Sequence, residues 1–220
     1  MLILITWFIN STAVAIMQTM LIYYYKYLIN DENAVTLAMI ALLVASLLTI
    51  PLWVWLCKKM GKKQAYFGGM TLTLTAVLIF AFFADSLGTV PALVLMALAG
   101  VGFSSHYVGP WAIVPDTIEY GYAETGRRSE GVYYSLWTFV VALGGALAGF
   151  LVGQGLDLFG YIPDVVQSSQ SLMGIRLLIG VLPGILILIA NIVLAIYPLT
   201  KEHYDQILEK IKNMDTEKTS

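Results

Sequence analysis

The sequence contains few charged residues and only one cysteine, Cys57. Charged side chains make up 12% of its 220 residues and hydrophobic ones 59%, whereas a soluble domain is about 25% charged. A soluble chain of this length has no core large enough to bury so much apolar surface. The composition therefore excludes an ordinary soluble domain and predicts a protein that lies in lipid.

Further absences narrow the functional classes. No basic patch with interleaved aromatic residues is present, which argues against nucleic-acid binding. The single cysteine rules out an internal disulfide framework and a multi-cysteine metal site, and we predict no metal or cofactor. His106, in "GFSSHYVGPW", lacks the G-x-S-x-G pattern of a serine hydrolase. We therefore interpret His106 as a helix-packing or cavity-lining residue and do not predict an enzyme.

Six apolar stretches are long enough to cross the roughly 30 Å hydrocarbon layer as helices. They cover residues 2–28, 35–57, 65–84, 89–115, 131–156 and 172–199. The sequence thus predicts an all-α polytopic membrane protein, with residues 1–200 forming one six-helix bundle. In residues 201–220 apolar side chains recur at helical spacing on an otherwise polar segment, which predicts an amphipathic tail on the cytoplasmic side.

The basic residues predict the orientation of the bundle. Ten of the twelve lysines and arginines fall in the second and fourth connections and in the tail, and only Lys26 and Arg176 lie opposite. Because basic residues accumulate in cytoplasmic loops, both termini are predicted to be cytoplasmic. The charged stretch "PDTIEYGYAETGRRSEG", residues 115–131, is then expected to be a cytoplasmic loop between the fourth and fifth spans.

No aspartate or glutamate lies in the middle of a predicted span. A Na⁺- or H⁺-coupled site near the bilayer midplane normally needs a carboxylate. The fourth span offers only Asp116 and Glu119, at its cytoplasmic end. Any coupling-ion site is therefore expected outside these spans.

The fifth span carries two patterns. Gly145, Gly149 and Gly153 recur every four residues, and such rows let helices approach closely in lipid. We favour packing inside one bundle over a dimer face. Nearer the cytoplasm, Trp137 and Thr138 combine a flat ring with a hydroxyl, which suits a sugar; an interfacial aromatic belt is the alternative.

The segment "WAIVPDTIEYGYAETGRRSEGVYYSLWTF" resembles the helix-ten to helix-eleven region of the glycoside–pentoside–hexuronide:cation symporters, the branch of the major facilitator superfamily that includes melibiose permease. The matching elements are Trp111, Pro115–Asp116, Glu119–Tyr120, Gly126, Arg128, Glu130–Gly131, Tyr134 and Trp137–Thr138. "GYIPD" and "YPLTKEHYDQI" resemble the family's last outer loop and tail. The resemblance covers nearly the whole chain.

This resemblance implies a bacterial inner-membrane transporter with twelve helices that imports sugars or glycosides together with Na⁺ or H⁺. Six spans correspond to its C-terminal half, so a second six-helix bundle is an expected partner and would hold most of the coupling-ion site. Many members also carry a helix-eleven lysine where this sequence has Ala142. We therefore expect that the chain does not perform symport by itself.

The resemblance also implies the site residues. Sugar binding would draw on the fourth and fifth spans, at Tyr107, Trp111, Trp137 and Thr138. A cytoplasmic gate would use Asp116, Glu119, Arg127 and Arg128, paired with one another or with the partner bundle.

Three other hypotheses stay open at this point. A truncated or split product could act as a membrane scaffold or assembly partner without transport. Two copies of the chain could instead form a homodimeric carrier. A lysolipid or another amphiphile could be the substrate, and an open lateral cleft would favour that class.

Overall fold

The structure, a computed structural model, describes residues 2–125 and 130–196 as six helical segments. They are α1 (Leu2–Tyr24) continued by the π-helical η1 (Tyr25–Ile29), α2 (Ala34–Met60), α3 (Lys62–Leu87), α4 (Thr89–Thr125), α5 (Glu130–Leu158), and α6 (Ser169–Arg176) continued by η2 (Leu177–Val181) and α7 (Leu182–Ile196). All six are long and apolar enough to cross a membrane. The predicted all-α polytopic bundle is confirmed. The predicted tail lies outside the described residues.

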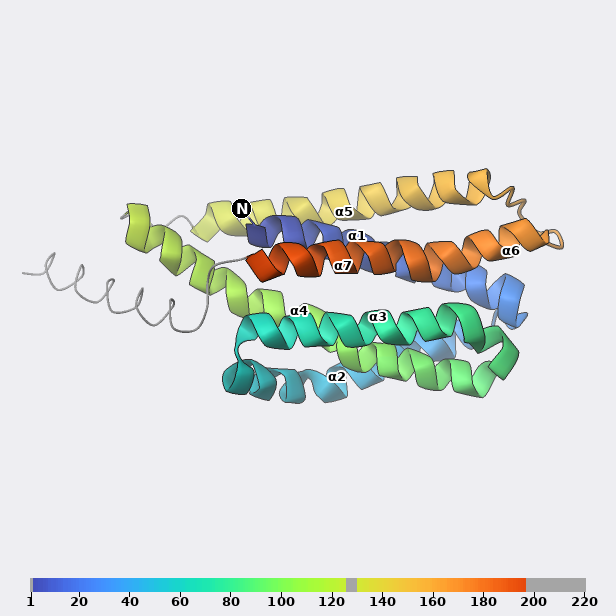
Figure 1. The fold of residues 1–220 in the computed structure, drawn as a ribbon, viewed down its shortest axis with the longest axis horizontal. Coiled ribbons are helices and arrows are strands. Elements are labelled where there is room, and N and C mark those ends of the chain that lie inside the picture. The colour runs from blue at the N-terminus through green and yellow to red at the C-terminus, as the bar shows by residue number, and fades with distance from the viewer. Residues whose placement is uncertain (1, 126–129, 197–220) are drawn as a thin grey trace, which may run out of the picture.

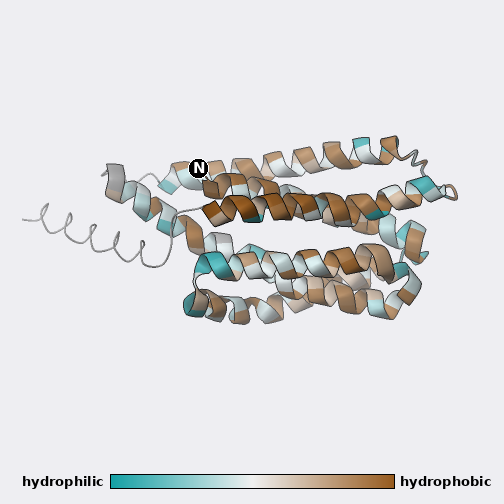
Figure 2. Ribbon diagram, in the orientation of Figure 1, coloured by the Kyte–Doolittle hydropathy of each residue, from teal (hydrophilic) through white to brown (hydrophobic). Residues whose placement is uncertain are grey.

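Glycine turns separate several of the helices. Gly61 and Gly88 adopt φ values of 95° and 88° between α2, α3 and α4, a region that only glycine enters without strain. Ser168 caps α6, because its hydroxyl accepts a hydrogen bond from the backbone N–H of Ser171 at 3.1 Å,. Figure 2 shows hydrophobic residues along most of each helix, with hydrophilic residues gathered at turns such as the α2–α3 connection.

The fourth span is longer than predicted. We expected it to end at residue 115 and Asp116 to lie in a loop, but α4 continues to Thr125. The prediction was wrong because a proline and several charges suggested a helix end. Asp116 is instead part of the helix and forms an ion pair with Lys62 at the start of α3, at 2.7 Å.

The helices form two groups of three. One group consists of α2, α3 and α4, and the other of α1, α5 and α7. Helix α4 packs mainly against α2 and α3, whereas α1 packs against α5 and α7. Contacts of α3 with α7 and η2 join the groups. In Figure 1, α1, α5 and α7 lie on one side and α2 and α3 on the other, while α4 crosses from the second group toward the beginning of α5. The first helix of each sequence half thus belongs to the other half's group.

Small and polar residues hold α4 close to α2 and α3. A Cβ atom at Gly100 would collide with the carbonyl oxygen of Leu42, and one at Gly102 would lie 2.6 Å from the carbonyl oxygen of Gly69. The Thr49 and Ser104 hydroxyls are 2.9 Å apart. Helices in lipid associate through such close backbone approach and interhelical hydrogen bonds, so this group is tightly fixed.

The glycine row of α5 behaves differently. A Cβ atom added at Gly145, Gly149 or Gly153 would meet no atom within 4 Å, so our expectation that this row packs inside the bundle was wrong. Gly144 of α5 faces α1 instead, and Ala148, one turn later, is also buried. Each of these residues directly precedes a glycine of the row in the sequence. Consequently the row itself points outward.

Helices α2 and α5 are the least covered of the six. Within the most apolar stretch of each helix, 17% of α2 and 22% of α5 is buried, against 44% to 56% for the other four. Large hydrophobic side chains are exposed along both, among them Leu47 and Leu48 of α2 and Phe139 and Phe150 of α5. These two helices present the largest uncovered apolar surfaces of the bundle.

Candidate functional site

Aromatic rings from three helices form a continuous row, which we call the aromatic row: Phe103, His106, Trp7, Trp137, Trp111 and Tyr134. Trp7 of α1 stacks between His106 of α4 and Trp137 of α5, with ring centroids 4.2 Å apart on each side. Trp111 of α4 leans against Trp137 at 6.2 Å. The row therefore connects helices from both three-helix groups.

Two of the four predicted sugar-binding residues, Trp111 and Trp137, lie side by side in this row. Trp137 is only 6% exposed, whereas Trp111 is 57% exposed. The ring of Trp111 is therefore accessible to a ligand, and the buried ring of Trp137 packs against it. The tilted contact with Trp137 and the stacked contact with Tyr134, at 6.3 Å, together fix the orientation of the exposed indole,.

The other two predicted residues lie beside the row. Tyr107 is 46% exposed and meets Phe103 and His106 edge-on, with centroids 5.2 Å and 6.1 Å away. Thr138 is exposed, and its hydroxyl donates to the carbonyl oxygen of Tyr134, one turn earlier in α5, at 3.0 Å. Tyr107, Trp111 and Thr138 are thus accessible, although no described contact joins Thr138 to the other two.

A buried polar chain crosses behind the aromatic row. The Asn10 amide nitrogen of α1 donates to the Tyr66 hydroxyl of α3 at 2.9 Å. That hydroxyl lies 3.4 Å from Nδ1 of His106 in α4. All three side chains are buried. These hydrogen bonds therefore link three helices inside the bundle, where polar groups are costly.

Sequence reasoning missed Trp7 and Tyr66 as parts of the site. It identified His106 as an unusual intramembrane residue but gave it no partners. One signal was available in α1, because Trp7 and Asn10 are three residues apart and therefore share a helix face. Their partners on other helices leave no comparable mark in the sequence.

The predicted gate is described in part. Both carboxylate oxygens of Asp116 accept from the Lys62 ammonium at 2.7 Å, and the same ammonium donates to the Ala112 carbonyl oxygen at 2.9 Å. Glu119 lines a cavity of about 180 Å³ between the end of α4 and the beginning of α5. Arg127 and Arg128 lie outside the described residues.

The opposite end of the bundle has its own ion pairs. Arg176 holds Asp85 through two hydrogen bonds of 2.9 Å and 2.6 Å, and the side chains of both residues are 22% exposed. Lys26 pairs with Asp164 at 2.7 Å and with Glu32 at 3.2 Å. A bidentate, partly buried pair fixes geometry better than an exposed one, so Arg176 and Asp85 fasten the end of α6 to α3.

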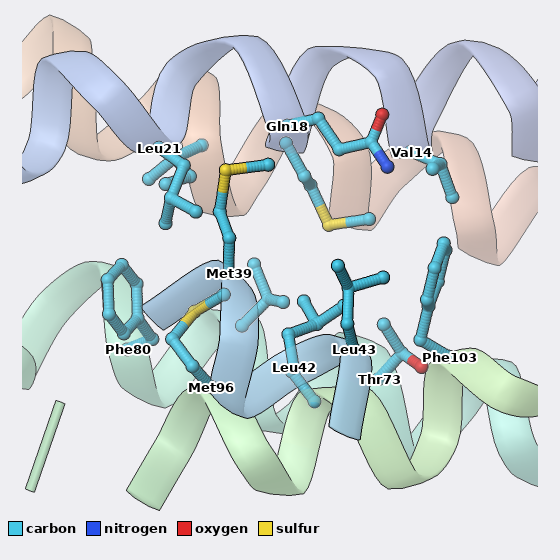
Figure 3. A pocket seen from close by; sticks show the side chains of 14 residues that line it. Val14, Gln18, Leu21, Met39, Leu42, Leu43, Thr73, Phe80, Met96 and Phe103 are labelled. Atoms are coloured by element: carbon cyan, nitrogen blue, oxygen red, sulfur yellow. The ribbon is translucent and has the colours of Figure 1, made fainter. Parts of the chain in front are cut away.

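A second pocket of about 80 Å³ lies between α1 and the α2–α4 group (Figure 3). Its lining is apolar apart from Gln18 and Thr73 and consists of Val14, Met17, Gln18, Leu21, Met39, Leu42, Leu43, Thr73, Val77, Phe80, Met96, Ala99, Phe103 and Ile179. Phe103 belongs both to this lining and to the aromatic row. The apolar pocket and the row are therefore neighbours.

Known proteins match this chain along nearly its whole length. A family model described as MFS/sugar transport protein matches residues 1–201. A putative sulfoquinovose importer of Escherichia coli (strain K12) is 36% identical over 206 residues, which cover 89% of this chain and 43% of that protein. A glucuronide carrier protein homolog of the same strain is 34% identical over 194 residues, with 87% and 42% covered.

An uncharacterised symporter of Bacillus subtilis (strain 168) is 30% identical over 211 residues, 96% of this chain and 45% of that protein. The chain thus spans less than half the length of the curated relatives it matches. These relatives are transporters, and the six apolar helices make this chain a multi-pass membrane protein. Because the family model covers almost every residue, the chain belongs to the MFS/sugar transport family of the major facilitator superfamily.

Proposed function

We propose that the chain forms the C-terminal half of a sugar:cation symporter and supplies one wall of its substrate cavity. The observation that carries this proposal is the pair of exposed rings, Tyr107 and Trp111, supported by buried Trp137. A sugar offers an apolar ring face for stacking and hydroxyl edges for hydrogen bonds. Relatives named for sulfoquinovose and for a glucuronide support a sugar derivative as the substrate.

A second six-helix bundle would complete the cavity. The exposed apolar sides of α2 and α5, together with the outward glycine row, are suited to close contact with other helices,. In alternating access the two bundles rock about a site near the midplane. The coupling Na⁺ or H⁺ would be bound mainly by the second bundle, because this sequence has no mid-span carboxylate.

The cytoplasmic gate would lie along the C-terminal part of α4. Asp116 and Glu119 stand there, and Arg127 and Arg128 follow in sequence. Ion pairs at such a place are individually worth about 0–1 kcal/mol when exposed. Several that break together can bias an inward–outward equilibrium of a few kcal/mol. The orientation proposed for the inner membrane places this gate and both termini on the cytoplasmic side.

The test is uptake of radiolabelled methyl glucoside and methyl glucuronide by cells that produce the 220-residue chain, with and without a second bundle taken from a relative. We expect uptake only when both are present. Trp111→Ala should reduce that uptake at least tenfold. Phe83→Ala is the matched control, because Phe83 is as exposed as Trp111, at 57%, but lies on α3 outside the aromatic row.

Two results would overturn the proposal. One is a reconstituted pair of bundles that assembles and still takes up neither sugar; a scaffold or assembly role without transport would then be favoured. The other is equal uptake by the Trp111 and Phe83 variants, because the aromatic row would then not be the substrate wall.

An amphiphilic substrate is a second candidate, and the apolar pocket of Figure 3 is the observation that favours it. Three methionines in its lining can adapt to different apolar groups. A lysolipid would need this pocket and would tolerate loss of Trp111. Competition of sugar uptake by a lysolipid, measured in the same cells, separates the two candidates.

A further inference from the structure

His106 is surrounded by four aromatic side chains. Trp7 and Phe103 both stack on the imidazole ring, with centroids 4.2 Å and 5.5 Å away and both interplanar angles 13°. Tyr66 stands at its Nδ1 edge, and Tyr107 meets the ring edge-on. Tyr66 and Tyr107 are the titratable groups among these contacts, and the described interactions of His106 include no carboxylate and no second base.

The hydrogen bonds of Tyr66 indicate which ring nitrogen of His106 carries the hydrogen. The Asn10 amide nitrogen can only donate, so the Tyr66 oxygen accepts from it,. The single Tyr66 hydrogen then has one described acceptor within reach, Nδ1 of His106 at 3.4 Å. A neutral imidazole that accepts at Nδ1 carries its hydrogen on Nε2. This arrangement favours Nε2 as the hydrogen-bond donor of the ring.

No described hydrogen bond uses the Nε2 donor. His106 is 6% exposed and is adjacent in sequence to Tyr107, whose ring is accessible. The two ring centroids are 6.1 Å apart, so a ligand stacked on Tyr107 would lie next to the imidazole ring. A purely structural role would not need this polarity, because an apolar ring would fill the same stack without the cost of polar groups in lipid.

We propose that His106 donates a hydrogen bond from Nε2 to a hydroxyl or carboxylate oxygen of the transported sugar. Asn10 and Tyr66 are positioning residues that hold the required tautomer. This inference rests on the proposed sugar-transport function and adds a specificity-determining residue to its substrate wall. It makes the site selective for ligands that present an oxygen acceptor beside the stacked ring face.

The tautomer can be measured without transport. The chain has two histidines, His106 and His203, so a His203→Asn variant labelled with ¹⁵N-histidine gives signals from His106 alone. In the full chain in lipid nanodiscs we expect the Nε2–H tautomer, and we expect Tyr66→Phe to produce a mixture of tautomers. A dominant Nδ1–H tautomer in the unmodified site would overturn the inference.

Binding gives the second test, with methyl β-D-glucoside as the probe and tryptophan fluorescence as the readout, in the chain assembled with a second bundle. His106→Leu should weaken binding about tenfold and Tyr66→Phe about threefold, as expected for loss or misalignment of one hydrogen bond. His106→Gln, which restores an N–H donor, should recover most of the affinity. Tyr23→Phe, at a tyrosine outside this chain of hydrogen bonds, should bind normally.

The outcomes separate this inference from the function on which it rests. If the sugar binds and His106→Leu binds equally well, His106 is a packing residue and the inference fails while the transport proposal stands. If the assembled wild-type protein binds no sugar at all, the proposed function fails and the inference fails with it. A shift of the His106 Nε2 resonance on sugar addition supports both.

Discussion

Helices α4 and α5 both carry glycines at close spacing, and the structure uses them in opposite ways. On α4, Gly100 and Gly102 lie against backbone atoms of α2 and α3, where no Cβ atom fits. On α5, a Cβ atom added at any of the three glycines of the spaced row would meet nothing within 4 Å. Glycine spacing therefore indicates that another helix can pack closely against this face. It does not predict whether that helix belongs to the same bundle.

The same contrast holds for polar side chains. The inner faces of α2 and α4 exchange hydrogen bonds through Ser46, Thr49 and Trp53, the last donating to the Val101 carbonyl oxygen at 2.6 Å. Much of α5 is exposed and apolar, and its packed side faces mainly α1. We infer that α4 holds the bundle together and that α5 presents a surface to another body.

The largest effect should come from placing a side chain where α4 has no room. Gly102→Ala puts a Cβ atom 2.6 Å from the Gly69 carbonyl oxygen and the Thr73 backbone nitrogen, and such overpacking costs about 1–3 kcal/mol. Gly149→Ala, the matched change on α5, should be neutral or stabilise the chain by about 0.5–1 kcal/mol. Thermal unfolding in nanodiscs, followed by circular dichroism, measures both, and equal losses would remove the contrast.

A smaller effect is expected at the ion pair between Lys62 of α3 and Asp116 of α4. In a double-mutant cycle with Lys62→Met and Asp116→Asn, the two changes should be non-additive by about 1 kcal/mol, because these side chains are in direct contact,. On α5 the exposed Glu130 provides the control, and Glu130→Gln combined with Lys62→Met should be additive. Additivity of the Lys62 and Asp116 changes would show that the pair contributes nothing to fold stability.

The interhelical hydroxyl bond should have a modest effect. Thr49→Val removes the contact with Ser104 and should cost about 0.6 kcal/mol, the average for such bonds in a membrane bundle. Thr75 bonds only to the carbonyl oxygen of Thr71, one turn earlier in α3, so Thr75→Val should leave the unfolding free energy nearly unchanged. The prediction fails if the two substitutions are equivalent.

The smallest effect on the chain itself is expected from Gly149→Leu, since a Cβ atom added at this position meets nothing within 4 Å. Its unfolding temperature should match that of the unmodified chain. The same substitution should reduce co-purification with a second bundle severalfold, because a large side chain keeps helices apart at a small-residue contact. Normal co-purification would place the partner on another face.

The number and extent of the spans could be predicted because apolar runs of sufficient length are interrupted only at turns. The end of α4 could not, since Pro115 and Asp116 are typical of a helix end when read alone. The pairing of Asp116 with Lys62, a residue 54 positions away, compensates the charge within the helix. A contact of that range has no local signature.

The site was predictable in the same uneven way. The resemblance pointed to Trp111 and Trp137, which the structure places in contact. Trp7 and Tyr66 were missed because helices that are apolar on nearly every side do not reveal which face turns inward. The rotation of each helix is decided by packing against the others, and only the assembled bundle shows that Trp7 fills the space between His106 and Trp137.

The central claim is that the open side of α5 receives a second six-helix bundle. A nitroxide attached at Gly149→Cys, in a Cys57→Ala background, reports its exposure to lipid through collisions with dissolved oxygen. We expect high oxygen accessibility at position 149 in the chain alone and a severalfold drop when the second bundle is co-assembled, while a label at exposed Ile192 of α7 stays accessible. Unchanged accessibility at position 149 in an assembled pair would contradict the claim.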